Sequence, residues 1–472
     1  MLASLRAGLR RPLSALATAP SRSPASPPAR YNSGIRLDCC PPPSRETAER
    51  VAGFDPNGSV WVEFSPLAAA VGAANLGQGF PDMPLPEFIS EALVDAARAG
   101  AMGHQYTRSR GHPGLVRALV DEYSGKLGGA LDDPDSQVLV TSGASAAIYA
   151  AINALVDPGE EVVLMEPFYD SYPASVELAG AVARYVPLEY TPEHVPAPPG
   201  SGRETVLSAS GWKLDLDKLE AAISPVTRML VLTTPHNPTG KVFSRAELEG
   251  IAELACKHDL IVLADEVYDS LVYSDSEPHV SIGSLPGMFQ RTITLGSAGK
   301  TFSVTGWRLG WALGPPKLIT ALWLVSQYIT FASPTPLQAA AAALFPAAHE
   351  HNYFTDSVAA LQAKRDLLVG ALARAGLDPI APQGSYFALA DTGSLPGPFP
   401  FEPVAGVPVG ETNARDYQVC RWLTQSAGVT AIPPSAFYSP DHAELAANYA
   451  RFCFCKADDT LAAGIEALNR LG

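Results

Sequence analysis

The stretch Leu295-Gly-Ser-Ala-Gly-Lys-Thr-Phe-Ser-Val-Thr-Gly-Trp-Arg-Leu-Gly310 contains the end of an apolar run, a turn of small residues and two cations. The apolar residues 292–295 favour a short strand, and Lys300 follows the small residues after it. Because few nearby side chains can solvate its amine, Lys300 can stay partly neutral and attack a carbonyl group. A solvated surface lysine is the alternative interpretation, since lysines are seldom buried. The motifs on the neighbouring strands decide between the two.

Apolar stretches like this one recur along the chain and alternate with helical patterns. The predicted strands are 137–141, 161–166, 228–233, 260–264 and 292–295, and a helix is predicted over 146–155. This alternation indicates an α/β fold in which helices cover both faces of a mostly parallel sheet. The helices and strands that follow residue 346 predict a second, smaller α+β domain. Two stretches rich in Pro and Gly, 191–211 and 392–412, are expected to be long loops.

Composition restricts the partners and the cofactors. The chain has 472 residues, of which 47% are hydrophobic and 17% charged, enough for two globular domains. No apolar run approaches the roughly 18 residues of a membrane helix, so no membrane partner is expected. The net charge of −15 argues against nucleic acid as a partner. The six cysteines form no C-x-x-C pair, so no metal site is predicted, and Cys453 and Cys455 are expected to be reduced core residues.

The first 37 residues differ from the rest of the chain. They contain six arginines and neither Asp nor Glu, and Leu2, Leu5 and Leu9 recur at near-helical spacing. An amphipathic, basic segment without acidic residues is typical of an organelle transit peptide. We therefore expect residues 1–43 to be a transit peptide and linker that direct the protein to an organelle matrix, with the mitochondrion favoured over the plastid. A disordered tail is the alternative.

The stretch Thr141-Ser-Gly-Ala-Ser-Ala146 closes a predicted strand and opens a predicted helix. Unpaired N–H groups at a helix N-terminus attract anions, and small side chains let a phosphate approach the backbone. Gly143, Ala144 and Ser145 are therefore candidate phosphate contacts. An ordinary strand-to-helix turn is the alternative.

Three further polar groups follow predicted strands. Tyr169 could stack on a planar ring, although core packing would also explain it. Asn237 lies between two prolines that fix its backbone, which suits its amide for one defined hydrogen bond; a plain Asn-Pro turn is the alternative. Asp265 ends a strand expected to be buried, and Tyr268 is expected one helical turn further along. A helix N-cap is the alternative for Asp265.

Together these residues are the parts that a pyridoxal phosphate site needs. Lys300 would hold the aldehyde, Asp265 would keep the ring nitrogen protonated, and Asn237 and Tyr268 would bind the ring hydroxyl oxygen. The predicted phosphate contacts are Ser297, Arg308 and the backbone around Gly143. In open parallel sheets such ligands lie beyond the carboxyl ends of the strands.

With these motifs the chain resembles the aminotransferases of class I/II, which have the PLP-transferase fold type I. It is most similar to the subgroup of kynurenine–oxoglutarate transaminases and cysteine-S-conjugate β-lyases, also called glutamine transaminase K. The matching stretches are Asn75–Asp82, Gln105–Thr107, Glu166–Tyr169, Asn237–Phe243, Asp265–Tyr268, Ser281–Met288, Gly296–Phe302 and Arg451–Phe454. They span about residues 45 to 470.

The resemblance implies further residue roles. Arg451 matches the arginine that binds the substrate α-carboxylate, and Gly79 matches a backbone contact to the same group. Trp61 resembles a tryptophan that lines the side-chain pocket, and Asn237 is implied in substrate binding as well. Tyr106 matches a tyrosine that reaches the cofactor phosphate of the neighbouring subunit, which implies a homodimer with shared active sites.

The resemblance also implies how the domains divide. Residues 44–86 would join the small domain, 87–345 would form the large cofactor-binding domain, and 346–472 would form the small C-terminal domain. Two features depart from the subgroup. Ala144 and Ser145 replace a glycine and an aromatic residue, and the 392–412 loop is unusually rich in Pro and Gly.

Three functions follow as hypotheses. The first is an aminotransferase that moves the amino group of an aromatic, sulfur-containing or glutamine-like amino acid, kynurenine included, to a 2-oxo acid. The second is β-elimination from cysteine S-conjugates at the same site, because both reactions begin by removing the proton from the α-carbon. The third is a non-catalytic protein that binds the cofactor. The joint presence of Lys300, Asp265, Asn237 and Arg451 argues against it.

Overall fold

The computed structural model describes residues 47–54 and 59–471. The chain divides into two units, Met1–Ala48 and Glu49–Gly472, and the second is the one described below. The predicted transit peptide lies outside the described residues. Within the described part of the chain, no helix is both long and apolar enough to cross a membrane.

A seven-stranded sheet forms the centre of the molecule, with the strand order β2-β12-β11-β10-β9-β3-β4. Its strands are β2 (Val138–Thr141), β3 (Glu161–Glu166), β4 (Val182–Pro187), β9 (Thr227–Thr233), β10 (Ile261–Asp265), β11 (Thr292–Ser297) and β12 (Gly310–Leu313). Every neighbouring pair is parallel except those of β12, which runs antiparallel to β2 and β11. The predicted α/β fold with a mostly parallel sheet is therefore confirmed.

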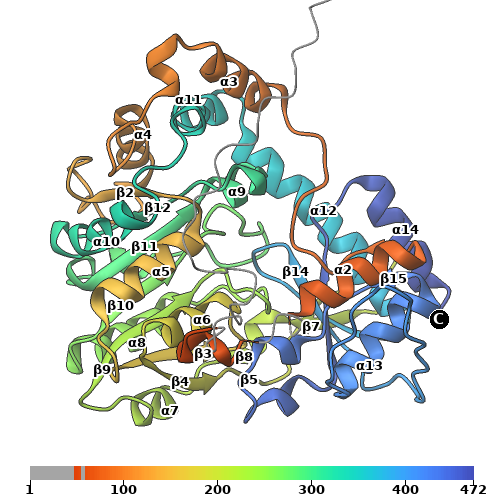
Figure 1. Cartoon of the computed structure of the whole chain (residues 1–472). Helices are drawn as coiled ribbons and strands as arrows, with labels where there is room; N and C mark the ends of the chain where they lie inside the picture. The colour runs from red at the N-terminus through yellow and green to blue at the C-terminus, as the bar shows by residue number, and fades with distance from the viewer. Residues whose placement is uncertain (1–46, 55–58, 472) are drawn as a thin grey trace, which may run out of the picture. The chain divides into compact units, whose positions relative to one another are not determined.

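Helices cover both faces of this sheet. Successive residues of each strand point to opposite sides, so alternate residues of one strand pack against different helices. Leu230 and Leu232 pack with residues of α7 (Leu216–Ala221) and α8 (Arg245–Lys257). Met229 and Val231 belong to the cluster on the other face. The helices of that cluster are α5 (Ala144–Leu155), α6 (Ser171–Leu178) and α10 (Pro316–Ile329) (Figure 1).

A further group of helices packs beyond the β2 edge of the sheet. It consists of α3 (Glu87–Arg98), α4 (Pro113–Tyr123) and α11 (Thr335–Glu350), seen at the top of Figure 1. The buried residues Val138, Val140 and Trp311 pack against these helices. The helix α12 (Tyr353–Arg374) then leads from this group to the C-terminal part of the chain.

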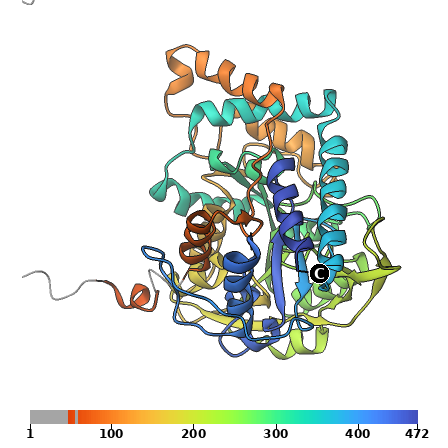
Figure 2. The same cartoon turned by 90° about the vertical axis from the view of Figure 1, so that its right-hand side faces the viewer.

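A second, five-stranded sheet has the order β16-β14-β13-β7-β6. Its strands are β6 (His194–Pro196), β7 (Thr205–Ser208), β13 (Asp378–Ala381), β14 (Phe387–Asp391) and β16 (Tyr449–Cys453). The helices of this part are α2 (Val60–Val71), α12, α13 (Arg415–Trp422) and α14 (Asp458–Asn469). Figure 2 shows α12 and α14 side by side along the second sheet. The remaining α-helices are the short α1 (Glu49–Ala52) and α9 (Ala298–Thr301). The remaining strands form two pairs, β1 (Ala74–Asn75) with β15 (Val429–Thr430), and β5 (Glu189–Tyr190) with β8 (Trp212–Lys213).

One of the two loop predictions is wrong. Residues 191–211 contain β6 and β7, and β7 pairs with β13, a strand about 170 residues later in the chain. Pro and Gly indicate local turns, but a distant strand can still satisfy the backbone hydrogen bonds of such a stretch. The 392–412 loop is confirmed, since no helix or strand lies between β14 and α13. The domain boundaries stay a prediction, although β6 and β7 come from the predicted large domain and pair with strands of the predicted small one.

Candidate active site

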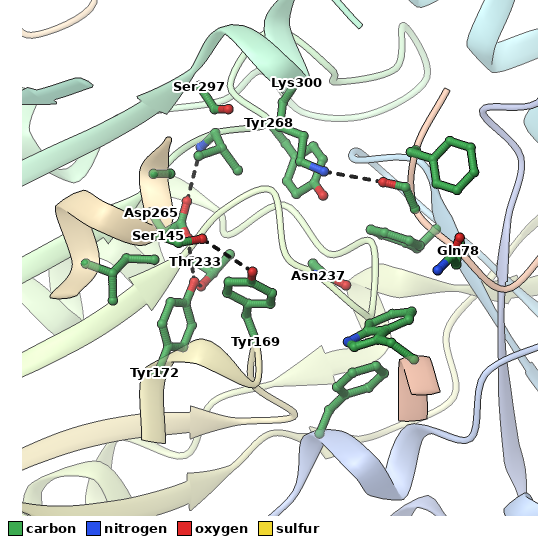
Figure 3. A pocket seen from close by; sticks show the side chains of 18 of the residues that line it. Gln78, Ser145, Tyr169, Tyr172, Thr233, Asn237, Asp265, Tyr268, Ser297 and Lys300 are labelled. Carbon is green, nitrogen blue, oxygen red and sulfur yellow. Dashed lines mark hydrogen bonds between the residues drawn. The ribbon is translucent and has the colours of Figure 1, made fainter. Parts of the chain in front are cut away.

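A cavity of about 280 Å³ lies at the carboxyl ends of the parallel strands β9, β10 and β11. The sequence predicts this position, because a ligand of an open parallel sheet binds beyond the ends of its strands. The predicted site residues line the cavity, with the exceptions of Gly143 and Tyr106 (Figure 3). Three charged side chains, Lys300, Asp265 and Arg451, decide what the cavity can do.

Lys300 lies on α9, the single helical turn that follows β11. Its Nζ donates a hydrogen bond of 2.5 Å to Tyr386 Oη and lies 3.4 Å from the carbonyl oxygen of Gly79. The rings of Tyr268 and Tyr386 lie 5.4 and 5.1 Å from the same nitrogen. Burial lowers the pKa of Lys300, because the charged ammonium is poorly solvated there. The amine can therefore be neutral and take a proton.

Asp265 ends β10 and is only 5% exposed. Its carboxylate accepts a hydrogen bond of 2.6 Å from Tyr172 Oη, and the backbone N–H of Val267 lies 3.4 Å away. Burial raises the pKa of Asp265, and the hydrogen bond from Tyr172 opposes that rise. Among the described residues no Lys, Arg or His forms an ion pair with it. A buried carboxylate of this kind fits a ligand that brings a cation, as the protonated ring nitrogen of pyridoxal phosphate would.

The expected helix after Asp265 is absent. Residues 267–270 form a turn, and Asp265 therefore caps no helix. Tyr268 nevertheless lines the cavity, where its ring meets the ring of Tyr386 edge-on at 5.1 Å. The prediction of one helical turn was wrong, but a tight turn brings the side chain to the same place.

The predicted phosphate contacts surround the N-terminus of α5. Gly143 has φ +87°, and a Cβ atom there would lie 2.7 Å from Arg308 Nη2, so the position requires glycine. Arg308 donates to the backbone of Thr305 and forms no ion pair with any described residue. Ser297 and Ser145 also line the cavity. A guanidinium without an ionic partner beside a helix N-terminus fits the phosphate of the expected cofactor.

Ser145 is one of the two residues that differ from the subgroup pattern. Its Oγ lies 3.5 Å from Tyr169 Oη, and Figure 3 marks this contact with a dashed line. Ala144 offers only a methyl group beside it. The hydroxyl of Ser145 thus contacts the ring that the sequence predicts to stack on the cofactor, where the subgroup places an aromatic residue.

Arg451 lies on β16 and is 1% exposed. It donates to Asn237 Oδ1 (3.1 Å) and to the Gly77 carbonyl (3.0 Å), while its buried Nε has no hydrogen-bond partner. Burial lowers its pKa to about 10. Among the described residues no carboxylate forms an ion pair with it. A buried donor without a partner is costly, so this arrangement fits a ligand that brings a carboxylate.

Aromatic side chains surround this guanidinium. The rings of Phe387, Phe437 and Trp61 lie 4.2, 4.8 and 5.3 Å from its central carbon. Trp61 is held in place because its indole N–H donates a hydrogen bond of 3.0 Å to Asp170 Oδ2. The site therefore combines an anion contact with an apolar wall, as an aromatic amino acid requires.

Sequence reasoning missed several residues of the site. Tyr172, which orients Asp265, lies in the stretch that predicts Tyr169, and a second tyrosine three residues further was its only signal. Phe387 and Phe437 come from the C-terminal part of the chain and carry no local motif. Tyr386 contacts Lys300 across 86 residues of sequence. Only the tertiary packing brings these side chains to the cavity.

Tyr106 lies away from the cavity. Its side chain is 85% exposed, and its ring meets that of Phe331 edge-on at 5.2 Å. It follows the short helix η2 (Ala101–His104).

The role of each predicted site residue stays a prediction. The contacts and the burial of the residues that line the cavity support these roles.

Comparison with known proteins identifies relatives that match most of the chain. The family model described as aminotransferase class I and II matches residues 72–468. The kynurenine–oxoglutarate transaminase of Dictyostelium discoideum is 41% identical over 91% of this chain and 96% of its own length. Kynurenine–oxoglutarate transaminase 3 of Mus musculus is 43% identical over 89% of both chains.

Solved structures agree with these relatives. The N-succinyldiaminopimelate aminotransferase of Mycobacterium tuberculosis is 38% identical, with a TM-score of 0.76 over 90% of this chain and 100% of that one. Bna3p of Saccharomyces cerevisiae, a candidate kynurenine aminotransferase, is 32% identical, with a TM-score of 0.82 over 90% and 99% of the two chains.

Proposed function

The chain belongs to the family of class I and II aminotransferases, and on that premise we propose that it moves the amino group of kynurenine-type amino acids to 2-oxo acids, 2-oxoglutarate included. It is a transaminase that depends on pyridoxal phosphate, and amino acids and 2-oxo acids are its substrates. The names of the relatives support kynurenine as donor and 2-oxoglutarate as acceptor. The aromatic wall beside Arg451 is the observation in this chain that carries the proposal.

The first task of the site is to bind and orient the substrate. Arg451 would hold the α-carboxylate through its guanidinium, which is already fixed by Asn237 and the Gly77 carbonyl. Trp61 and Phe437 would then contact the side chain of the amino acid. Because the guanidinium is buried among rings, the bound carboxylate would be shielded from water, which strengthens the contact.

The second task is to move a proton. The bound cofactor, held by Lys300, Asp265, Arg308 and the turn around Gly143, would supply an electron sink for the α-carbon. Nζ of Lys300 would take the proton from the α-carbon and return it, since burial favours the neutral form of this amine. Asp265 would hold the ring-nitrogen proton, and Tyr172 would keep the carboxylate in place.

The test is a panel of amino donors measured against several 2-oxo acids, with protein that lacks the first 43 residues. We expect kynurenine, other aromatic donors, methionine and glutamine to exceed aspartate and alanine in kcat/KM. The Lys300→Ala variant is the control and should lose turnover by about 10⁴-fold or more. Full turnover by that variant, or a preference for small acidic donors, would contradict the proposal.

The same panel tests β-elimination. A cysteine S-conjugate would lose its α-proton to the same amine and its sulfur group as a thiol, and hydrolysis of the remaining unsaturated product by water would yield pyruvate and ammonia. We propose elimination as a side activity of this site, so a cysteine S-conjugate should yield pyruvate even when no 2-oxo acid is added. If the conjugate forms no pyruvate and only passes its amino group to an added 2-oxo acid, transamination is the sole activity. If amino acids leave the absorbance of the bound cofactor unchanged, a non-catalytic role follows instead.

We also propose that the protein is a homodimer with shared active sites. Several large apolar side chains near η2 and the C-terminal end of α10 are exposed to solvent. They are Met102 (80%), Tyr106 (85%), Tyr328 (86%), Ile329 (55%) and Phe331 (49%). The two segments contact each other, since the rings of Tyr106 and Phe331 meet edge-on at 5.2 Å. An exposed group of this kind favours an interface between subunits.

Residues 1–43 are proposed to direct the protein to an organelle matrix, with the mitochondrion favoured over the plastid. The support is the basic, acid-free composition of the segment. A fusion of these residues to a fluorescent protein should appear in the organelle and lose part of its length there. Diffuse fluorescence of the full-length fusion would indicate a disordered tail instead.

A further inference from the structure

Tyr386 precedes β14 and is buried beside Lys300, and none of the roles above includes it. Its hydroxyl makes two hydrogen bonds of opposite sense. It accepts from Lys300 Nζ at 2.5 Å and donates to the Gly79 carbonyl at 2.8 Å. Since the single proton of the hydroxyl goes to Gly79, only a lone pair remains for the lysine amine. The side chain is 1% exposed, so water does not compete for either bond.

The kind of acceptor matters for a lysine that must act as a base. A carboxylate in this place would stabilise the ammonium strongly and raise the pKa of Lys300. Burial instead raises the pKa of Tyr386 well above that of a free tyrosine, so its hydroxyl stays neutral. A neutral acceptor can hold the amine in a defined position with little stabilisation of the charged form.

The aromatic surroundings restrict the amine further. The rings of Tyr268 and Tyr386 meet edge-on at 5.1 Å, and both lie within 5.4 Å of Nζ. Tyr386 itself is fixed, because the ring of Phe387 packs against it at 4.8 Å and the backbone N–H of Phe454 donates to its carbonyl. The hydroxyl therefore keeps a fixed position, and the flexible side chain of Lys300 can form the same hydrogen bond to it whenever the amine is free.

We propose that Tyr386 is a positioning residue that holds the free amine of Lys300 whenever this amine is not bonded to the cofactor. The hydrogen bond keeps Nζ at the edge of the cavity with its lone pair available for the proton of the α-carbon. This inference rests on the role of Lys300 in the transaminase reaction. It goes beyond that role by naming the group that orients the amine and stabilises its free state.

Tyr386 could alternatively act only through Gly79. The family resemblance implies that the backbone of Gly79 contacts the substrate carboxylate, and the Tyr386 hydroxyl donates a hydrogen bond to the Gly79 carbonyl. Loss of that bond alone would weaken substrate binding and raise KM. Loss of the bond to Lys300 would instead lower kcat, because the proton-transferring amine would be less well placed.

The experiment compares Tyr386→Phe with Tyr273→Phe in the holoenzyme. Tyr273 is a matched control, since it is equally buried and donates to the Ser385 carbonyl at 2.5 Å, without a hydrogen bond to Lys300. The first readout is the equilibrium of the half-reaction, followed by cofactor absorbance at fixed ratios of amino acid to oxo acid. Because the amine form of the cofactor leaves Lys300 free, Tyr386→Phe should shift this equilibrium toward the aldehyde form by about fivefold.

The second readout is kinetic. In Tyr386→Phe we expect kcat to fall by about tenfold and KM to change less than about twofold. The isotope effect on kcat with an α-deuterated donor should increase, because proton transfer then limits the rate more fully. Tyr273→Phe should leave the equilibrium and the isotope effect as in the wild type. A raised KM with unchanged kcat, isotope effect and equilibrium would assign Tyr386 to Gly79 alone and overturn the proposal.

A second substitution applies if Tyr386→Phe does not retain the cofactor. Incorporation of 3-fluorotyrosine at position 386 preserves the shape but weakens the oxygen as an acceptor. It should move the half-reaction equilibrium in the same direction by a smaller factor, and an unchanged equilibrium would contradict the proposal. If Lys300→Ala keeps full turnover, the function itself fails. If Lys300→Ala is inactive but Tyr386→Phe behaves like the wild type, only this inference fails.

Discussion

Lys300, Asp265 and Arg451 have lost most of their water in the site, and burial moves each of them toward its neutral form. It lowers the pKa of Lys300 and Arg451 and raises that of Asp265. For Lys300 this is a requirement of the chemistry, because only the neutral amine can take a proton. For Asp265 and Arg451 it means that a ligand with the opposite charge gains from binding, since each lacks an ionic partner among the described residues.

The pH dependence of kcat follows from the lowered pKa of Lys300. The amine must be unprotonated to act, so kcat should be lost as the pH falls through this pKa and be retained above it. Because burial lowers the pKa below 10.5, the rise of kcat should be centred below that pH. The measurement is kcat against pH with a saturating aromatic donor. A rise that is centred at or above pH 10.5 would show that the amine is solvated.

Among the elements, the contact between β12 and the turn before α5 shapes the phosphate site. A Cβ atom on Gly310 would lie 2.6 Å from the Ala144 nitrogen and 2.7 Å from the Gly143 carbonyl carbon. Both are backbone atoms and neither can rotate away. The close approach thus holds the N–H groups of the turn near Arg308, which is where the anion is expected.

Gly310→Ala should therefore weaken cofactor binding. We expect the Kd for pyridoxal phosphate to rise at least about tenfold, because the turn must move to admit the methyl group. Gly306→Ala is the control in the same stretch, since a Cβ atom there meets nothing within 4 Å. Titration of the two apoproteins by fluorescence measures the effect. Equal affinities in the two variants would contradict the assigned phosphate site.

The 392–412 loop is tied to α2, the helix that carries Trp61. Arg421 of α13 and Glu63 of α2 form a buried ion pair with N–O distances of 2.5 and 3.0 Å. The same two side chains bind the backbone of Gly410, and Arg421 also donates to the Thr412 carbonyl. The loop thus contributes indirectly to the wall of the substrate pocket.

Arg421→Ala should destabilise the protein by about 3–5 kcal/mol, because it leaves the buried Glu63 carboxylate without a cationic partner. The measurement is urea unfolding followed by circular dichroism. Arg245→Ala removes the exposed Arg245–Glu249 pair on α8 and should change the free energy of unfolding by less than about 1 kcal/mol. Similar small losses in both variants would show that the loop is not held by the buried pair.

For the molecule as a whole, a homodimer with shared active sites predicts that two different variants restore activity when their subunits are mixed, which a monomer could not do. Mixing inactive Lys300→Ala subunits with weakly active Tyr106→Ala subunits should restore about a quarter of wild-type activity. Half of the dimers are then hybrids, and each hybrid has one site with both residues intact. The mixture is unfolded, refolded and assayed. If Tyr106 acts within its own subunit, the activity of the mixture stays at the average of the two variants.

Local sequence patterns predict those parts of the molecule in which the interacting residues are close together in the sequence. Continuous apolar runs predict the parallel strands, and the small residues around Lys300 and Gly143 mark the turns at their ends. Lys300, Asp265 and Asn237 each carry a motif of their own. The site was therefore predictable wherever one strand end supplies one polar group.

Contacts between distant segments lay beyond such patterns. β7 pairs with β13 although its surroundings are rich in Pro and Gly, and Tyr386 meets Lys300 from the start of β14. The free Nε of Arg451 and its ring of aromatic side chains depend on α2, β14 and β16 packing together. Backbone propensity and periodicity act over a few residues, whereas burial, pKa and hydrogen-bond partners depend on what the folded chain brings into contact.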